Sequence, residues 1–328
     1  MGIYKGDQNQ TGFFYESGLY ANASGTQHWI GQVQEAPIDE ELNRIRQRYQ
    51  GTDSRNVSTF LDGPHGFTGN LNYNPQDWKF LMFALGSNVD SGSPSPYTHT
   101  ISESDNGEGN AFTSGTRCPF MSFGLEVAQK TSVAGENYIR TVNGANVDTL
   151  TISASQGEKV VCNVDYIANS VVYSSGAATA LTPTTTRPFL WDDCSVEIGA
   201  TAVQNLISFD WSIANNPDAK HLLNGSKEIS SPTMDNREYS MTATVEGNSS
   251  QTKAFYEQYF LGGSTFNAKL TIDASTGSRD MILTMSGCSM VDMDSPHGVE
   301  GTNEQTLTIE PQIVDIVIND TIELYNPW

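Results

Sequence analysis

The side chains that could do chemistry in this chain are spaced for neither metal binding nor catalysis. Its histidines are isolated from one another, and isolated histidines are more often surface or capping residues than metal ligands. They are His28, His65, His99, His221 and His297. The cysteines lie far apart, with no C-x-x-C pair, which argues against zinc and against a disulfide framework. They are Cys118, Cys162, Cys194 and Cys288. We expect most of them to be buried thiols, with one disulfide left open as an alternative, and no bound metal.

Pairs of carboxylates are the other candidates for catalysis. Asp192–Asp193 and Glu40–Glu41 are adjacent, and adjacent side chains of a strand point to opposite faces, so neither pair forms a dyad by itself. Asp292 and Asp294 fall on one side of an extended segment, a weak Ca²⁺ signal for which a solvated loop is the more common explanation. A hydrolase on a β scaffold would depend on these acids. Because the chain has no nucleophile elbow, phosphate loop or dinucleotide fingerprint, we expect no enzyme, no catalytic residue and no cofactor.

The composition is that of a folded and strongly acidic chain. Of 328 residues, 37% are hydrophobic and 17% charged, and 38 acidic against 17 basic residues give a net charge of −21. A surface this negative repels phosphates, which argues against specific recognition of nucleic acid. Ser, Thr, Asn and Gly take the place of charged residues, which suits many strands joined by loops. The acidic excess is either a solvated coat or a functional field, and composition leaves both open.

Neither secretion nor a membrane span is expected. Residues 1–7 lack the apolar core of a signal peptide, and no apolar stretch approaches about 18 residues. Glycosylation sequons require a secretory route, so here they are interpreted as chance occurrences. They start at Asn22, Asn56, Asn224, Asn248 and Asn319.

Hydrophobic spacing predicts a mainly β chain with two short helices. Apolar residues at helical spacing predict a helix over 76–85, packed on a sheet. Residues 37–48 contain a possible helical turn, and residues 88–118 form the longest stretch without a pattern, which we place at a subunit contact. From residue 120 onward, segments alternate with period two between Gly, Asn and Ser, which indicates strands.

The second half of the chain repeats the order of the first. A Gly turn and a polar loop lead to an alternating strand at 67–73 and then to an aromatic helix at 76–86 that ends in Gly. The same order recurs with a strand at 239–245 and a helix at 251–262. A chain that repeats one module offers two similar edges, so a ring of such chains has half as many subunits as modules.

Several segments together resemble the major tail tube proteins of tailed viruses. The resemblance is closest to the long, two-module versions in viruses with flexible, non-contractile tails, and it covers most of residues 30–325. The segments are 51–56 (GTDSRN), 67–81 (FTGNLNYNPQDWKFL), 146–154 (NVDTLTISA), 236–241 (NREYSM) and 265–270 (TFNAKL).

The resemblance implies a mainly β fold of two tandem tail-tube-like β-sandwich or barrel modules, each with a short flanking α-helix. We place an N-terminal arm at 1–28, a first module at 29–176 that includes the long loop 88–118, a linker at 177–187 and a second module at 188–328. Such chains are expected to form trimeric rings with pseudo-sixfold symmetry, because a ring satisfies the open edges of sheets. The arm is expected to be ordered only where it meets a partner or its own body. The arm and the long loop are the segments expected to reach the neighbouring ring.

The expected function is therefore structural. The resemblance implies a virion protein, assembled in the host cytoplasm, that polymerises into stacked rings and forms the tail tube through which DNA passes. Its partners would be further copies of itself and the tail terminator, tape measure and tail tip proteins, with no membrane involved. A pore lined with carboxylates would let DNA slide without sticking.

A different class of structural protein is the alternative. A capsid decoration or surface β-sandwich protein would bind glycans or receptors as a monomer or small oligomer. It would present exposed aromatic residues such as Trp29 or Trp328 at a binding face.

Overall fold

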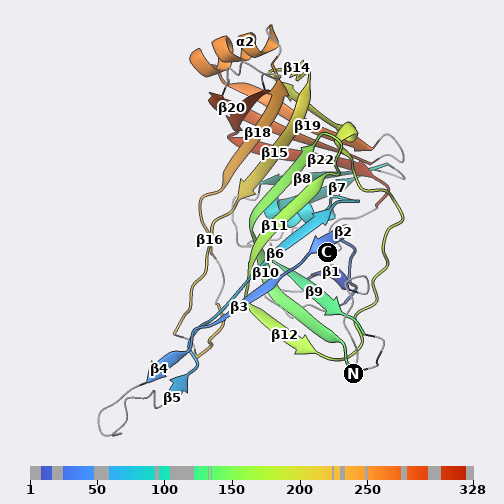
Figure 1. The fold of residues 1–328 in the computed structure, drawn as a ribbon, viewed down its shortest axis with the longest axis vertical. Helices are drawn as coiled ribbons and strands as arrows, with labels where there is room; N and C mark the ends of the chain where they lie inside the picture. Colours follow the sequence, from blue (N-terminus) through green and yellow to red (C-terminus); the bar gives the residue numbers. More distant parts are fainter. Residues whose placement is uncertain are drawn as a thin grey trace.

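A computed structural model gives a mainly β protein with two short helical segments, which confirms the expected fold class (Figure 1). Elements far apart in sequence lie side by side in three antiparallel sheets. The structure describes residues 9–16, 25–47, 59–92, 96–103, 122–131, 133, 135–223, 225–229, 233–247, 250–274, 279–294 and 304–322.

The N-terminal sheet has the strand order β1–β9–β10–β12. Not all of these strands alternate between apolar and polar residues, because nearly all of β9 is buried on both faces. The strands are β1 (Gln10–Tyr15), β9 (Phe123–Gln129), β10 (Tyr138–Ser155) and β12 (Ser170–Ser174).

The central sheet runs in the order β3–β6–β11–β10–β15–β18–β21–β20, with β2 also paired to β6. In these strands buried apolar residues alternate with more exposed polar ones, as in β18 and β11. Its other strands are β2 (Gln32–Glu35), β3 (Ile38–Leu42), β6 (His65–Asn74), β11 (Val161–Ala168), β15 (Leu206–Ala214), β18 (Glu238–Glu246), β20 (Arg279–Asp294) and β21 (Glu304–Glu310).

The C-terminal sheet has the order β14–β13–β19–β20–β22–β8–β7. It joins the last strands of the chain to a hairpin from the first half. Its other strands are β7 (Gly86–Ser91), β8 (Tyr97–Glu103), β13 (Cys194–Ile198), β14 (Thr201–Ala202), β19 (Phe266–Ala274) and β22 (Ile313–Asp320).

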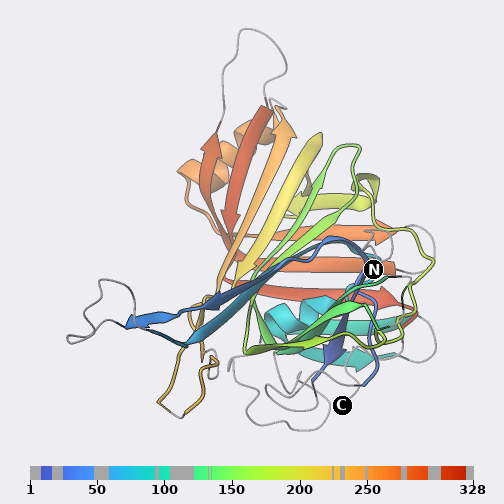
Figure 2. The same ribbon diagram turned by 60° about the horizontal axis from the view of Figure 1, so that its bottom comes forward.

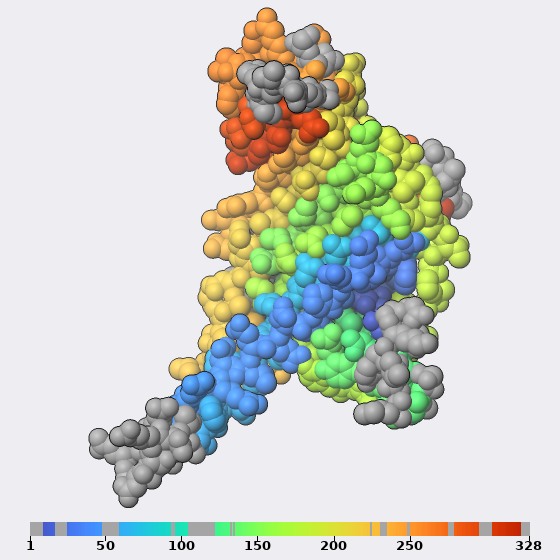
Figure 3. Space-filling view, viewed as in Figure 1, coloured from blue at the N-terminus to red at the C-terminus, as the bar shows by residue number. Residues whose placement is uncertain are grey.

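Two small ribbons lie outside these sheets. They are β4 (Ile45–Gln47) with β5 (Thr59–Leu61), and β16 (Pro217–Asp218) with β17 (Thr233–Met234). Figures 1 and 2 both show the β4–β5 ribbon on a projection that leaves the body of the molecule. The same projection stands out in the space-filling view (Figure 3).

The two longest strands each belong to two sheets, because each bends at a glycine. Gly144 in β10 has φ +62 and Gly287 in β20 has φ +64. This left-handed region is open to glycine and costly for residues with a Cβ. Up to one residue past the bend each strand pairs in an outer sheet, and from the next residue onward each pairs in the central sheet.

The pairing pattern around the bent strands occurs twice. In the first strand set β10 pairs with β9, β11 and β12, and β11 pairs with β6. In the second set β20 pairs with β19, β21 and β22, and β21 pairs with β18. A bulge falls between Val147 and Thr149 in one set and between Met290 and Asp292 in the other.

One continuous core fills the space between the sheets. Its centre is aromatic: Phe80, Phe83 and Phe123 have ring centroids 4.8 to 5.4 Å apart, and Phe13 lies 5.6 Å from Phe80. Burial of each such ring contributes about 1.5–3 kcal/mol relative to exposure. Within the described residues, no helix is long and apolar enough to cross a membrane.

Where the structure describes the expected arm, part of it is a strand in the body of the chain. Residues 10–15 form β1, in which Phe13 and Phe14 are buried and pair with Leu125 and Gly124 of β9. Nearly all of this strand is buried, which explains why its aromatic residues show no period in the sequence.

Two local expectations are wrong. The helical turn within 37–48 is strand, because Ile38–Leu42 pairs with β6. The loop 88–118 contains the end of β7 and all of β8, which pair with each other, while β8 also pairs with β22. Its polar sequence gave no signal because the partner strand lies more than 200 residues away. Residues 104–118 lie outside the described part of the chain.

The helix expected at 76–85 starts later than predicted. A 3₁₀ turn covers Lys79–Leu81 and α1 covers Met82–Leu85. Gln76 donates its side-chain amide to the Thr186 carbonyl, and Trp78 stacks on Phe189 at 4.8 Å. These contacts hold the preceding residues out of the helix. The second helix begins with α2 (Gln251–Phe255) and continues as a π-helical segment, Tyr256–Leu261.

Candidate functional site: the polar face and the open edges of the central sheet

The histidines singled out by the sequence do not come together. His28 packs against Tyr15 at 4.7 Å, and burial together with the charge of Lys79 lowers its pKa to about 4. His65 lies half-buried at the start of β6, and His221 is exposed. His297 lies outside the described residues. In the described part of the chain, no group of three or more His, Cys, Asp or Glu residues could hold a metal ion.

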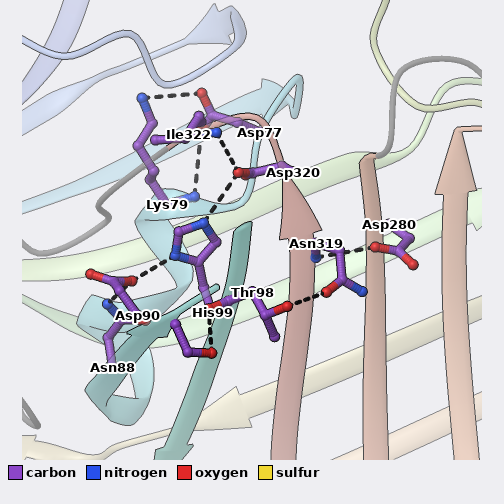
Figure 4. A network of polar contacts seen from close by, with 11 residues as sticks. Asp77, Lys79, Asn88, Asp90, Thr98, His99, Asp280, Asn319, Asp320 and Ile322 are labelled. Atoms are coloured by element: carbon purple, nitrogen blue, oxygen red, sulfur yellow. Dashed lines mark hydrogen bonds and ion pairs between the residues drawn. The ribbon is translucent and has the colours of Figure 1, made fainter. Parts of the chain in front are cut away.

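His99 differs from these histidines because each of its ring nitrogens has an acidic partner. It lies on β8, fully buried, with Nδ1 2.6 Å from Asp90 of β7 and Nε2 3.2 Å from Asp320 of β22 (Figure 4). Burial alone would lower the pKa of His99, but hydrogen bonds to Asp320 and Asp90 outweigh it and raise the pKa to about 9. The imidazolium therefore ties the β7–β8 hairpin to the second strand set. No spacing in the sequence signals this group.

The cysteines are inert thiols where they are described. Cys162, Cys194 and Cys288 are free, with Cys162 and Cys288 buried. Burial raises the thiol pKa of Cys162 and Cys194 to about 12. Protonated thiols are weak nucleophiles and poor metal ligands. Cys118 lies outside the described residues.

The carboxylate pair Asp192–Asp193 has a structural role. Asp193 accepts two hydrogen bonds from Arg187, at 2.6 and 2.7 Å, and one from the Leu190 N–H at 2.9 Å. Burial would raise the pKa of Asp193, but these hydrogen bonds outweigh it and lower the pKa. Asp193 therefore anchors the segment that joins the two strand sets.

One face of the central sheet is polar across its whole width. Asn70 donates to Asp165 at 2.7 Å and to Asn163 at 3.0 Å, and Thr149 donates to Asp165 at 2.8 Å. These bonds link β6, β11 and β10 above the buried face. The same face continues over the second set through Ser212, Asp210, Ser240, Thr242, Thr244, Thr306, Thr308, Asp292 and Asp294.

Charge on this face has a single sign. In the parts of the described strands that pair in the central sheet, the charged residues are acidic and none is Lys or Arg. Burial and the neighbouring Asp165 raise the pKa of Asp148, and burial raises that of Asp210. Small hydroxyls and amides fill the space between the acids. In its described strands the face is therefore acidic and presents no cationic side chain to a phosphate.

The central sheet is open at both edges within the described residues. β3 pairs only with β6, and residues 289–294 of β20 pair only with β21. Asp39 and Glu41 project from one edge, and Asp292 and Asp294 from the other, all exposed. The expectation that Asp292 and Asp294 share one side is confirmed, although they stand on a strand and not in a loop.

Exposed apolar side chains gather near the same two ends. On the second helix Leu261 is 64% exposed and Tyr256 is 41% exposed, and on β12 Val172 and Tyr173 are about half exposed. Figure 1 places the helix and β12 at opposite ends of the molecule. Unpaired edges with apolar neighbours are places where another chain attaches.

A sheet with a polar, acidic face and two edges left open within the described residues is able to pair with strands of another chain. Comparison with known families agrees. The model of the family described as phage tail tube protein matches residues 16–315. The chain belongs to this phage tail tube protein family, so it is a structural protein of the virion tail that assembles into a tube. No curated protein matches the chain.

Proposed function

We propose that three copies of this chain close into a ring, and that stacked rings form the tube of a long, non-contractile tail. In this proposal each strand set is one module, and a ring has six modules. The supporting observation is the pairing of β10 with β15, which joins the two sets into one sheet over seven residue pairs, from Thr149–Ala214 to Ser155–Ser208. We call this pairing the internal seam.

The internal seam supplies a template for contacts between copies. β15 lies beside β18 in the second set as β3 lies beside β6 in the first. The edge of β20 in one copy can therefore meet the edge of β3 in the next as β10 meets β15 inside the chain. A contact of this head-to-tail kind closes into a ring when the rotation per unit allows it.

The polar face of the central sheet is proposed to line the bore. Phosphates on a passing DNA would meet hydroxyls, amides and carboxylates, and no Lys or Arg from the described strands. Electrostatic attraction is the main source of non-specific DNA binding, so a bore without cations lets DNA pass during ejection. The acidic excess then acts as a functional field.

The β4–β5 projection is the proposed contact between stacked rings. The projection leaves the body of the molecule (Figure 2), and on it Ile45, Phe60 and Leu61 are each about half exposed. This assigns to the projection a role that the sequence placed in residues 1–28 and 88–118. At the ends of the tube, the terminator, tape measure and tip proteins are the proposed partners.

The decoration alternative receives no support from its proposed binding aromatics. Trp29 donates its indole N–H to Gln76 at 2.8 Å and is partly buried. Trp328 lies outside the described residues.

Electron microscopy of the purified chain tests the proposal. We expect trimeric rings with six similar lobes, or tubes of stacked rings, with a ring mass three times that of the chain by light scattering. Monomers at every concentration and salt would contradict it, and rings with another copy number would contradict the trimer.

A further inference from the structure

The residues that meet in a contact between copies follow from strand register. In the first set Leu150 pairs with Val164, which pairs with Leu71. In the second set Met293 pairs with Leu307, which pairs with Ala243. In β10 the bulge ends one residue before Leu150, and in β20 it ends one residue before Met293. Thr149 and Thr151 of β10 therefore correspond to Asp292 and Asp294 of β20.

The other side of the seam is located in the same way. Trp211 of β15 pairs with Met241, and Ile38 of β3 pairs with Gly69. Gly69 and Met241 are equivalent for the following reason. Each pairs with a residue of the neighbouring strand, and that residue in turn pairs with the residue just before the bulge of β10 or of β20. A second bulge supports the match, between Leu206 and Ser208 in one set and between Val33 and Glu35 in the other. Ser212 and Ala214 therefore correspond to Asp39 and Glu41.

The two seams differ in charge although their geometry corresponds. The internal seam places Thr149 opposite Ala214 and Thr151 opposite Ser212. The same register between copies places Asp292 opposite Glu41 and Asp294 opposite Asp39. Like charges directly opposite each other destabilise an antiparallel pair, and charged edges keep sheets from joining.

We propose that this second seam, the closing seam, is gated by charge: its two rows of carboxylates hold separate copies apart until salt or other contacts offset their repulsion. The partner is a second copy of this chain. The inference rests on the proposed ring. The internal seam joins two strands of the same chain, so it forms at any protein concentration. Charge does not have to control it. The closing seam decides when and where a ring forms.

Salt provides the first test. The Debye length is about 10 Å at 0.1 M and about 3 Å at 1 M, so salt screens carboxylates across an exposed seam. Between about 30 mM and about 500 mM NaCl, the protein concentration for half-maximal ring assembly is expected to fall roughly 2- to 30-fold, from two like-charge pairs. Static light scattering measures this concentration.

Variants separate the seam from the net charge of the chain. Asp292→Asn with Asp294→Asn should assemble at low salt and lose most of the salt dependence. The control, Asp273→Asn with Glu158→Gln, removes two exposed charges away from both edges and should keep it. Asp292→Lys with Asp294→Lys places cations opposite Glu41 and Asp39, so its salt dependence should change sign.

Cross-linking tests the register. Asp292→Cys protein mixed with Glu41→Cys protein should form a disulfide dimer on oxidation, because directly paired residues have Cβ atoms within reach. Asp292→Cys with Glu35→Cys is out of register and should give only the background of the parent chain.

The outcomes separate the two proposals. Rings without the 292–41 cross-link, or Asn variants whose salt curve matches the control, overturn the inference and leave the ring standing. The absence of rings or tubes from every variant at every salt concentration overturns the proposed function and the inference with it. Tm values of the variants show whether each is folded, and the cross-link is independent of the charge substitutions.

Discussion

At the residue scale, His99 shows how one side chain joins segments far apart in sequence. Its two carboxylate partners come from β7 and from β22, 9 and 221 residues away. Asp320 also accepts the Ile322 N–H at 2.7 Å, so a backbone hydrogen bond holds this carboxylate in addition to the imidazole. A buried cation between two oriented acids is favourable only while all three partners keep their charge.

This geometry predicts a pH-dependent stability. The pKa of His99 is raised from 6.5 to about 9 in the folded chain. Its stabilising effect is therefore fully present below about pH 6.5 and is lost as pH rises through about 9, a change of up to about 3 kcal/mol. Denaturant unfolding of the monomer at several pH values, compared with His99→Gln, should show the difference between the two proteins shrinking over this window. His221→Gln, at an exposed site, is the control, and a difference that does not vary with pH would contradict the prediction.

At the element scale, the two bent strands, β10 and β20, connect the outer sheets to the central sheet. Each passes from an outer sheet into the central sheet at one glycine, and its pairing partners change there. Asn215 secures the same region: its side chain donates to the carbonyls of Ala84 and Val147 and accepts from Arg237. The bend, α1 and the internal seam therefore meet around one buried amide.

A substitution at the bend tests this view. Gly144→Ala places a Cβ on a residue at φ +62 and should destabilise the chain by about 1–2 kcal/mol. Gly66→Ala is the control, because a Cβ there meets its nearest atom at 3.8 Å. Urea unfolding measures both, and equal midpoints for Gly144→Ala and the parent would contradict the proposed strain.

At the scale of the whole molecule, the two helices differ in burial because α1 is covered on all sides, whereas the second helix packs against β19 and β20 and leaves its other side exposed. Met82–Leu85 is entirely buried, next to β7, β8 and β10. The second helix lies at the free end and leaves Leu261 and Tyr256 exposed. In the proposed ring the next copy covers it.

Leu261→Glu should therefore impair assembly without changing the fold. The side chain is 64% exposed in the single chain, so Tm should change little, while a buried carboxylate in the ring should raise the concentration for assembly at least about tenfold. Thr185→Glu, in the exposed connecting segment, should assemble normally. Unchanged assembly by Leu261→Glu in analytical ultracentrifugation would show that this end stays free.

The sequence predicted the mainly β class, most strands after residue 120 and the existence of two short helices, because alternation and helical spacing are local properties. It also singled out Asp292–Asp294 and Glu40–Glu41 as pairs of carboxylates. Their place on open edges depends on which strands pair.

Pairing is what only the tertiary structure decided. The strand character of residues 97–103, the partners of His99 and the internal seam between β10 and β15 depend on contacts between distant segments. No local pattern encodes them, because a strand edge accepts any partner that the packing of both faces brings into register. The same physics explains the buried β1, whose aromatic side chains reveal no period until the sheet that covers them is known.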